Sequence, residues 1–127
     1  MTPLDTLTFM QGSWRIQGHM HGQAVQGAAT VERVAAGLLY REVVDGYEDL
    51  CIYRVDPHGE LEVHHFSEDG VFRHAVHRMD DSSGFHWVPM SVHGPVVRVL
   101  PQADGFRIEV AHRDAPTPDV VLEFRRT

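Results

Sequence analysis

The feature that most constrains this chain is a series of short segments in which apolar and polar residues alternate. Clusters of Gly, Pro, Asp and Ser separate these segments at intervals of about 8 to 12 residues, which is typical of sandwiches and barrels. The alternation predicts strands with one buried and one solvated face. Only residues 3–11 are expected to form a short helical turn. Strands are expected near residues 13–20, 24–35, 38–45, 48–56, 59–67, 70–80, 84–91, 95–101, 104–113 and 119–126.

These strands determine the expected fold class. No predicted helix is long enough to cover a sheet face, so the antiparallel strands must close as a barrel or pack as a sandwich. In residues 106–113 the apolar side chains share one face with His112 and the charged ones share the other. That separation fits a tube that is apolar inside and wet outside. We therefore predict an all-β fold for residues 1–127, namely one domain that is a single antiparallel up-and-down β-barrel of about 8–10 strands.

Charge narrows the range of functions. The formal net charge is −7, and all 11 basic residues are arginines. An acidic chain without a basic run is a poor partner for phosphate backbones, so no nucleic-acid binding is expected. The absence of lysine excludes Schiff-base chemistry and a Walker-type phosphate-binding loop.

The expected location is the cytoplasm. No apolar run approaches the roughly 20 residues that a membrane span needs. The first residues, MTPLDTLTFMQGSW, lack the basic start and apolar stretch of a secretory signal. Cys51 is the single cysteine and cannot form an internal disulfide bond, which also favours a reducing compartment.

Ten histidines are the one unusual feature of the composition, and four of them flank a turn at residues 67–70. A three-residue turn with a bulge at Gly70 would bring Arg73 and His77 to the inner face. A two-residue or four-residue turn separates apolar from charged residues more cleanly, so we favour that register. It places on one face Leu61, Val63, His65, Phe72, His74 and Val76. Surface positions are expected for His19, His21, His58, His64, His77, His86 and His93.

The same argument extends the inner face to two earlier strands. Residues 56–59 predict a three-residue bulged hairpin that pairs Asp56 with Glu60. With the turn at Asp45-Gly46, this register predicts an inner wall of Tyr40, Glu42, Cys51, Tyr53, Val63, His65, His74 and Val76, to which Trp87 and His112 are candidate additions. An apolar wall with a few convergent polar groups is typical of a small-molecule site.

Each candidate also has a purely structural interpretation. Tyr40 and Tyr53 fit core aromatics with hydrogen-bonded hydroxyls, and His65 and His74 fit a mutually satisfied core pair. An unpaired buried carboxylate is costly, so Glu42 is expected either at the barrel mouth or paired with His65 or a ligand. Cys51 fits a small core residue.

The entry into the first strand, FMQGSW, resembles the start of calycin barrels, which include lipocalins, fatty-acid-binding proteins and, with a weaker resemblance, nitrobindin-like haem barrels. Their first strand carries Gly-x-Trp, here Gly12-Ser13-Trp14. The resemblance implies that a basic residue near the end of the last strand packs over the tryptophan. Arg126 is the first candidate and Arg125 the second. The expected role of Trp14 and Arg126 is structural, with the indole closing the narrow end under a cation–π contact.

Three functions follow from these observations. The leading hypothesis is binding of a small, largely apolar ligand without a cofactor, oriented by Tyr40, Glu42, Tyr53, His65, His74 and Trp87. A second is haem or metal binding. The nitrobindin-like resemblance implies a proximal histidine near the connection into the last strand, where His112 lies, although the chain is shorter and residues 116–118 differ. Zinc held by His65, His74 and a third ligand such as His112 is the metal version.

The third hypothesis is an enzyme in which Glu42 and His65 act as a general acid–base pair in isomerisation, cyclisation or hydrolysis. A homodimer is also expected. Leu50 and Ile52 alternate with Cys51 and Tyr53, so this strand carries apolar residues on both faces and its outer face can pair with a second copy.

Overall fold

In the computed structural model, the described residues are 2–80, 83–92, 94–112, 115 and 117–127. In this part of the chain, the 3-10 helix η1 (Pro3–Met10) precedes ten strands. The strands are β1 (Gly12–Met20), β2 (Gln23–Val34), β3 (Gly37–Val44), β4 (Tyr47–Val55), β5 (Leu61–Ser67), β6 (Gly70–Arg78), β7 (Phe85–Trp87), β8 (Pro95–Gln102), β9 (Gly105–His112) and β10 (Val120–Arg126).

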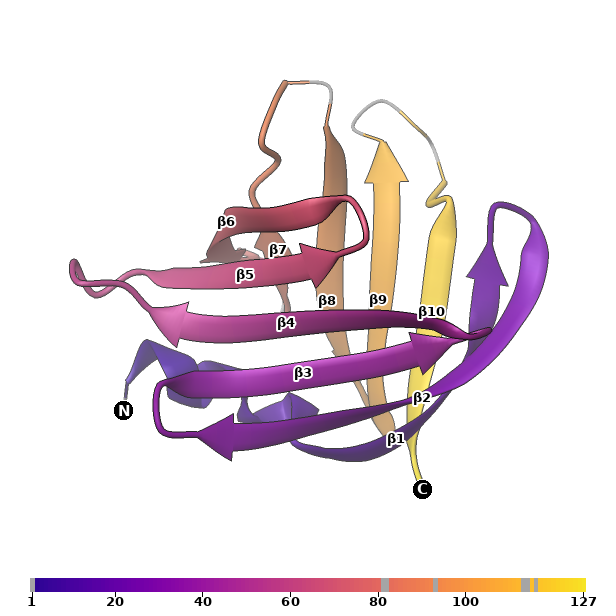
Figure 1. The fold of residues 1–127 in the computed structure, drawn as a ribbon, viewed down its shortest axis with the longest axis horizontal. Helices are drawn as coiled ribbons and strands as arrows, with labels where there is room; N and C mark the ends of the chain where they lie inside the picture. The colour runs from indigo at the N-terminus through magenta and orange to yellow at the C-terminus, as the bar shows by residue number, and fades with distance from the viewer. Residues whose placement is uncertain (1, 81–82, 93, 113–114, 116) are drawn as a thin grey trace.

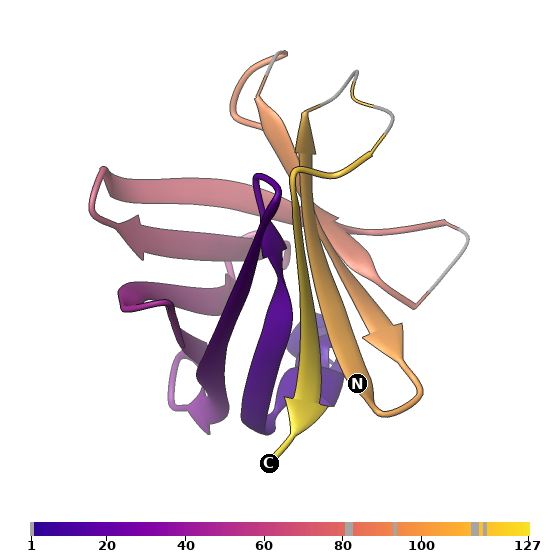
Figure 2. The same ribbon diagram turned by 90° about the vertical axis from the view of Figure 1, so that its right-hand side faces the viewer.

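These strands form a closed antiparallel barrel. Each strand pairs with its neighbours in sequence, and β1 pairs with both β2 and β10, which closes the ring. In Figure 1, β3 to β6 run across the view while β8 to β10 run nearly upright. Figure 2 shows the same arrangement turned by 90°. The all-β fold and the up-and-down barrel are confirmed, and the sandwich alternative is excluded.

One expected strand is much shorter than the sequence pattern predicts. A strand was expected over residues 84–91, whereas β7 spans only Phe85–Trp87. The backbone N–H of Val88 still donates to the carbonyl of Ala75 at 2.8 Å. Pro89 has no N–H and cannot continue the ladder. The other strands begin and end within a residue or two of the predicted bounds.

The two ends of the barrel differ. We call the end that carries η1 the helix end, and the end that carries the β1–β2, β3–β4 and β5–β6 turns the far end. At the helix end, Leu4, Leu7 and Met10 of η1 are buried against the core. Large aromatic side chains fill the interior between them and the middle of the barrel: Trp14, Tyr53, Phe85, Phe106 and Phe124. Phe106 and Phe124 stack with their ring centroids 4.2 Å apart.

The Gly-x-Trp motif lies at the helix end. Trp14 is buried, and its indole N–H donates to the carbonyl of Met10 at 2.7 Å. The guanidinium carbon of Arg126 lies 4.4 Å from the centroid of the Trp14 ring, so the contact expected from the sequence is present. Gly12 has a φ of 136°, and a Cβ built there would lie 2.5 Å from Nη1 of Arg126. The positive φ favours glycine at this position, and a larger residue would also have to displace the guanidinium group of Arg126.

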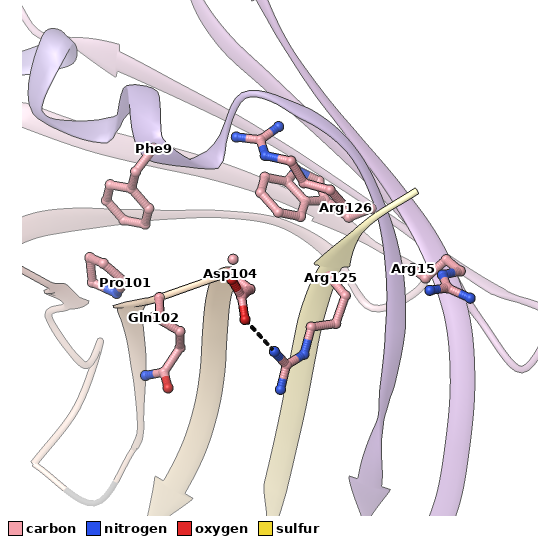
Figure 3. Close-up of a pocket in the computed structure, with 10 residues that line it drawn as sticks. Phe9, Arg15, Pro101, Gln102, Asp104, Arg125 and Arg126 are labelled. Carbon is pink, nitrogen blue, oxygen red and sulfur yellow. Dashed lines mark ion pairs between the residues drawn. The ribbon is translucent and has the colours of Figure 1, made fainter.

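A pocket of about 670 Å³ lies beside this motif, lined in part by Phe9, Arg15, Arg125 and Arg126. Figure 3 shows Arg125 turned toward Asp104, with which it forms an ion pair of 3.6 Å between exposed side chains.

Within the described residues, no helix is long and apolar enough to cross a membrane.

Candidate functional site

The inner face of β3 to β6 has the register favoured from the sequence. Ser67 pairs with Gly70, so the alternative bulged register is not formed. The hairpin at Asp56 is also as expected, because its N–H donates to the carbonyl of Glu60 at 2.8 Å and Gly59 has a φ of 84°. The inner face therefore carries the cross-strand pairs Tyr40–Cys51, Glu42–Asp49, Cys51–His65, Tyr53–Val63 and Val63–His74.

These pairs bring polar and aromatic side chains together inside the barrel. Trp87 joins them from β7, where it pairs with the buried Val76. The six residues proposed from the sequence to orient a ligand all lie on this inner face. We define the inner cluster as these six residues with one addition: Tyr40, Glu42, Asp49, Tyr53, His65, His74 and Trp87.

Glu42 is a half-buried carboxyl group held by a tyrosine. The hydroxyl of Tyr40 donates to Oε1 of Glu42 at 2.5 Å. Burial raises the pKa of Glu42 to about 7; the hydrogen bond from Tyr40 and the charge of His65 oppose this rise, while the charge of Asp49 adds to it. At neutral pH Glu42 therefore populates both protonation states, as a general acid or base must.

Asp49 is the member of the inner cluster that sequence analysis missed. Its Oδ1 lies 3.2 Å from Nε2 of His65. The side chains of His65 and Asp49 are 24% and 42% exposed, so solvent reaches this pair. The alternation that places Cys51 on the inner face also places Asp49 there, two residues earlier on β4. The sequence therefore contained the signal.

Trp87 lies between the two inner histidines. Its ring centroid is 5.5 Å from that of His65 and 5.2 Å from that of His74. Its indole N–H donates to the hydroxyl of Tyr53 at 3.1 Å. Nδ1 of His74 lies 3.1 Å from the carbonyl oxygen of Val88. A carbonyl only accepts hydrogen bonds, so this Nδ1 carries a proton.

An apolar wall lies across the barrel from the members of the inner cluster on β3 to β6, and it begins next to Trp87, which pairs with Val97. Val97, Val110, Val120 and Met20 are successive cross-strand partners from β8 through β9 and β10 to β1. Val120 is buried, and the other three are half-buried against the core. In the closed strand order, these strands occupy the arc opposite β3 to β6. The interior near the far end therefore presents polar groups on one wall and apolar groups on the other.

His112 does not join the inner cluster. It shares a face with Val110, but it pairs with Pro95 on the last rung of β9. Its side chain is 67% exposed, and its Nε2 lies 3.6 Å from a carboxylate oxygen of Asp119. The described ranges hold no group of three or more His, Cys, Asp or Glu side chains placed to bind a metal ion. Zinc binding that involves His65, His74 and His112, and haem binding through His112, stay predictions.

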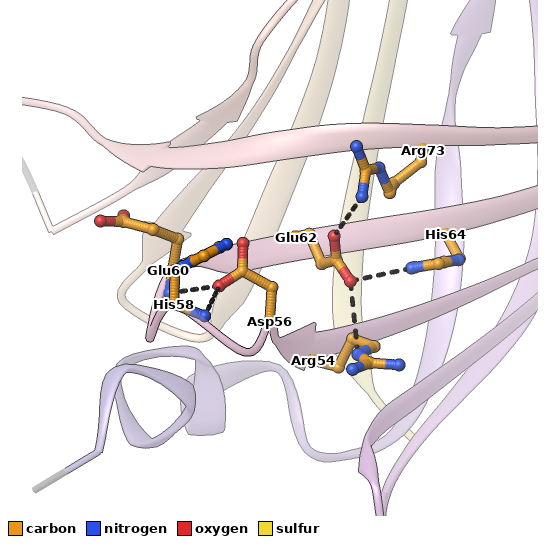
Figure 4. Close-up of polar contacts among 7 residues, drawn as sticks. All are labelled: Arg54, Asp56, His58, Glu60, Glu62, His64 and Arg73. Atoms are coloured by element: carbon orange, nitrogen blue, oxygen red, sulfur yellow. Dashed lines mark hydrogen bonds and ion pairs between the residues drawn. The ribbon is translucent and has the colours of Figure 1, made fainter.

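A second polar group surrounds Glu62 on the outer face of β5, where Figure 4 shows three basic side chains turned toward its carboxylate. Oε1 lies 3.3 Å from Nε of Arg54 and 3.0 Å from Nε2 of His64, and Oε2 lies 3.5 Å from Nη1 of Arg73. Glu62 is only 7% exposed, although it faces outward. His64 therefore lies on the outside of the barrel, where it belongs to the ion-pair network around Glu62.

The other histidines expected at the surface lie outside the inner cluster. His86 is half-buried on the outer face, beside His77 at 5.9 Å between ring centroids. His93 falls outside the described residues. The remaining ones are exposed: His19, His21, His58 and His77.

Comparison with known proteins identifies no relative: no family model, no curated protein and no solved structure matches this chain. The chemistry of the inner cluster is therefore inferred from its own residues. Its carboxyl groups and imidazoles exchange protons and hydrogen bonds, and Trp87 contributes an aromatic ring with an apolar face.

Proposed function

We propose that this protein binds a small, largely apolar molecule inside the far end of the barrel, where the inner cluster orients the polar group of the ligand. The observation that carries the proposal is that the inner cluster members on β3 to β6 lie on the arc of strands opposite the apolar wall, while Trp87 pairs with Val97 of that wall. Burial of apolar ligand surface contributes affinity at roughly 25 cal/mol per Å² before the costs of association. The inner cluster contributes specificity through hydrogen bonds.

The shape of the barrel supports the same function. A closed ten-stranded barrel, a Gly-x-Trp entry and an arginine over the tryptophan agree with the resemblance to calycin barrels, which are mostly ligand carriers. A fold-level analogy does not identify the ligand, so the proposal depends on the inner cluster.

The two tryptophans provide a site-specific test. Trp14 lies at the helix end with its N–H on Met10, and Trp87 lies in the inner cluster with its N–H on Tyr53. We would titrate ¹⁵N-labelled protein with the neutral apolar probe N-phenyl-1-naphthylamine and follow both indole N–H signals. The Trp87 signal should shift and saturate while the Trp14 signal stays in place. Unchanged signals, or equal shifts of both, would refute binding at the inner cluster.

Native mass spectrometry of the protein as purified complements this titration. Its mass is compared with the denatured mass of the same sample. An added mass of an apolar metabolite that disappears on denaturation supports the carrier function, whereas the mass of haem or zinc supports the second hypothesis.

Acid–base catalysis is the second candidate function, because one observation favours it. Glu42 has a pKa of about 7 and lies near the His65–Asp49 pair, so a proton acceptor and an oriented imidazole are present on the same wall. Such groups suit isomerisation or cyclisation of a bound ligand. If a bound metabolite is recovered, incubating it with the protein and with Glu42→Gln tests for turnover; conversion by the wild type alone supports catalysis.

A further inference from the structure

The acidic groups on the inner wall near the far end are Glu42 and Asp49, and the imidazole of His65 is bonded to Asp49. Glu42 and Asp49 are directly opposite each other on β3 and β4. Among the described residues, the arginines at inward register positions belong to the helix end. Arg33 lies 3.4 Å from Asp5 of η1, Arg78 pairs with Phe85, and Arg126 covers Trp14. Hence no described guanidinium shares the inner wall with the two carboxyl groups.

This distribution discriminates between ligand classes. A ligand carboxylate or phosphate bound there would lie close to Glu42 and Asp49 without an arginine to bind it, and the like charges would repel each other. Like charges directly opposite each other on neighbouring strands destabilise a sheet. A cation between the two carboxyl groups would relieve this repulsion. The charges therefore favour a positively charged ligand group.

We propose that the ligand of this barrel is an apolar amine, whose protonated nitrogen binds between Glu42 and Asp49 while its hydrocarbon part packs on the apolar wall. This inference rests on the proposed binding function and specifies the ligand class. The hydrocarbon part meets Met20, Val97 and Val110, the half-buried members of that wall.

The aromatic side chains of the inner cluster suit the same ligand. Trp87 lies within 5.5 Å of the His65 ring, and His65 bonds Asp49. The imidazole of His65 therefore links the carboxylate of Asp49 to an indole, which is the aromatic ring that attracts cations most strongly. Hydrogen bonds to Nε2 of His74, an acceptor in the neutral imidazole, add a further partner for an N–H donor.

A matched ligand series tests the inference. We would titrate 1-aminooctane, 1-octanol and octanoate at pH 7 and physiological salt, following the Trp87 indole N–H signal. All three are unbranched molecules of eight carbons, and their polar groups are cationic, neutral and anionic at pH 7. We expect the amine to bind at least tenfold more tightly than the alcohol, and octanoate to bind most weakly.

A double variant identifies the carboxyl groups responsible. In Glu42→Gln/Asp49→Asn, the amine should lose its advantage over the alcohol, while the alcohol still binds. Glu48→Gln is the matched control, because Glu48 is exposed and neighbours Asp49 on the outer face of β4; it should keep the preference.

The outcomes separate the two proposals. Equal or tighter binding of octanol or octanoate at Trp87 would overturn the amine inference and leave the binding function standing. A Trp87 signal that responds to none of the three ligands would overturn the binding function and the amine inference with it.

Discussion

Glu42 and Asp49 are cross-strand partners on the inner face of the barrel, yet each carboxyl group is held by a different side chain. Tyr40 donates to Glu42 at 2.5 Å, and His65 lies 3.2 Å from Asp49. Two ionised carboxylates facing each other destabilise a sheet. The raised pKa of Glu42 lets this repulsion be relieved by protonation, which ties the stability of the barrel to pH.

Stability should therefore fall as the pH rises through the titration range of Glu42. The pKa of this group rises from an ordinary value of 4.5 to about 7 in the folded protein, so between these values the folded state binds more protons than the unfolded chain. The full shift corresponds to roughly 3 kcal/mol, and partial solvent access reduces this to about 2 kcal/mol.

Urea denaturation of the wild type and of Glu42→Gln between pH 4 and pH 8 isolates this contribution. The free energy of unfolding of the wild type should decrease relative to the variant by about 2 kcal/mol over this range. A constant difference between the two proteins would show that Glu42 does not titrate in the folded state near neutral pH.

Two histidines on β6 should differ sharply in their effect on ligand binding. His74 lies on the inner face beside Trp87, whereas His77, three residues later, is exposed on the outer face. His74→Ala removes a polar group from the inner cluster and should weaken probe binding about tenfold, which corresponds to one hydrogen bond of about 1.4 kcal/mol. His77→Ala should leave the affinity unchanged. Equal affinities of both variants for N-phenyl-1-naphthylamine would contradict a ligand role for His74.

Turn chemistry explains why the inner face could be predicted from the sequence. Asp45 and Gly46 both have positive φ values, 48° and 86°, which is the two-residue hairpin geometry that an Asp-Gly pair favours. Once such turns fix the register, side-chain alternation assigns each residue to a face. Tyr40, Glu42 and His65 were placed correctly for this reason.

Three features of the structure could not be predicted from the alternation of apolar and polar side chains. His112 has inward parity, but parity does not say how close a residue lies to the rim, where solvent surrounds it. Glu62 has outward parity, but its burial arises from Arg54 and Arg73 on two flanking strands. The short β7 arises from the missing N–H of Pro89, which side-chain polarity does not reveal.

The ion-pair network on the outer face should stabilise the fold modestly. Glu62→Gln removes the charge that holds Arg54, His64 and Arg73, and all three are exposed or partly exposed and can be solvated by water. The free energy of unfolding should therefore fall by about 1 to 2 kcal/mol, less than for a fully buried pair. Glu60→Gln, at an exposed position two residues earlier, should change it by less than about 0.5 kcal/mol. Equal effects of the two variants would mean that the network contributes nothing.

Self-association is expected through the outer face of β4 to β6. Leu50, Phe66 and Val71 are successive cross-strand partners there, and Val71 is 62% exposed. Apolar side chains that continue across three strands favour contact with a second copy. Sedimentation equilibrium should give a dimer mass at micromolar concentration and a monomer mass for Val71→Asp, whereas Met90→Asp, another exposed apolar position, should remain dimeric. A monomeric wild type would refute the homodimer.

The cation–π contact at the helix end should contribute measurably to stability. Arg126 covers the buried Trp14 at 4.4 Å and donates to the carbonyl of Gln11 at 3.2 Å. Arg126→Ala removes both contacts and should lower the free energy of unfolding by about 1 to 2 kcal/mol. Arg125→Ala is the matched control. The neighbouring Arg125 forms an ion pair with the exposed Asp104, and exposed ion pairs contribute little to stability. Urea denaturation of both variants compares them directly. The stacked geometry predicts that Arg126 holds the indole in place. A larger loss of stability for Arg125→Ala would contradict this prediction.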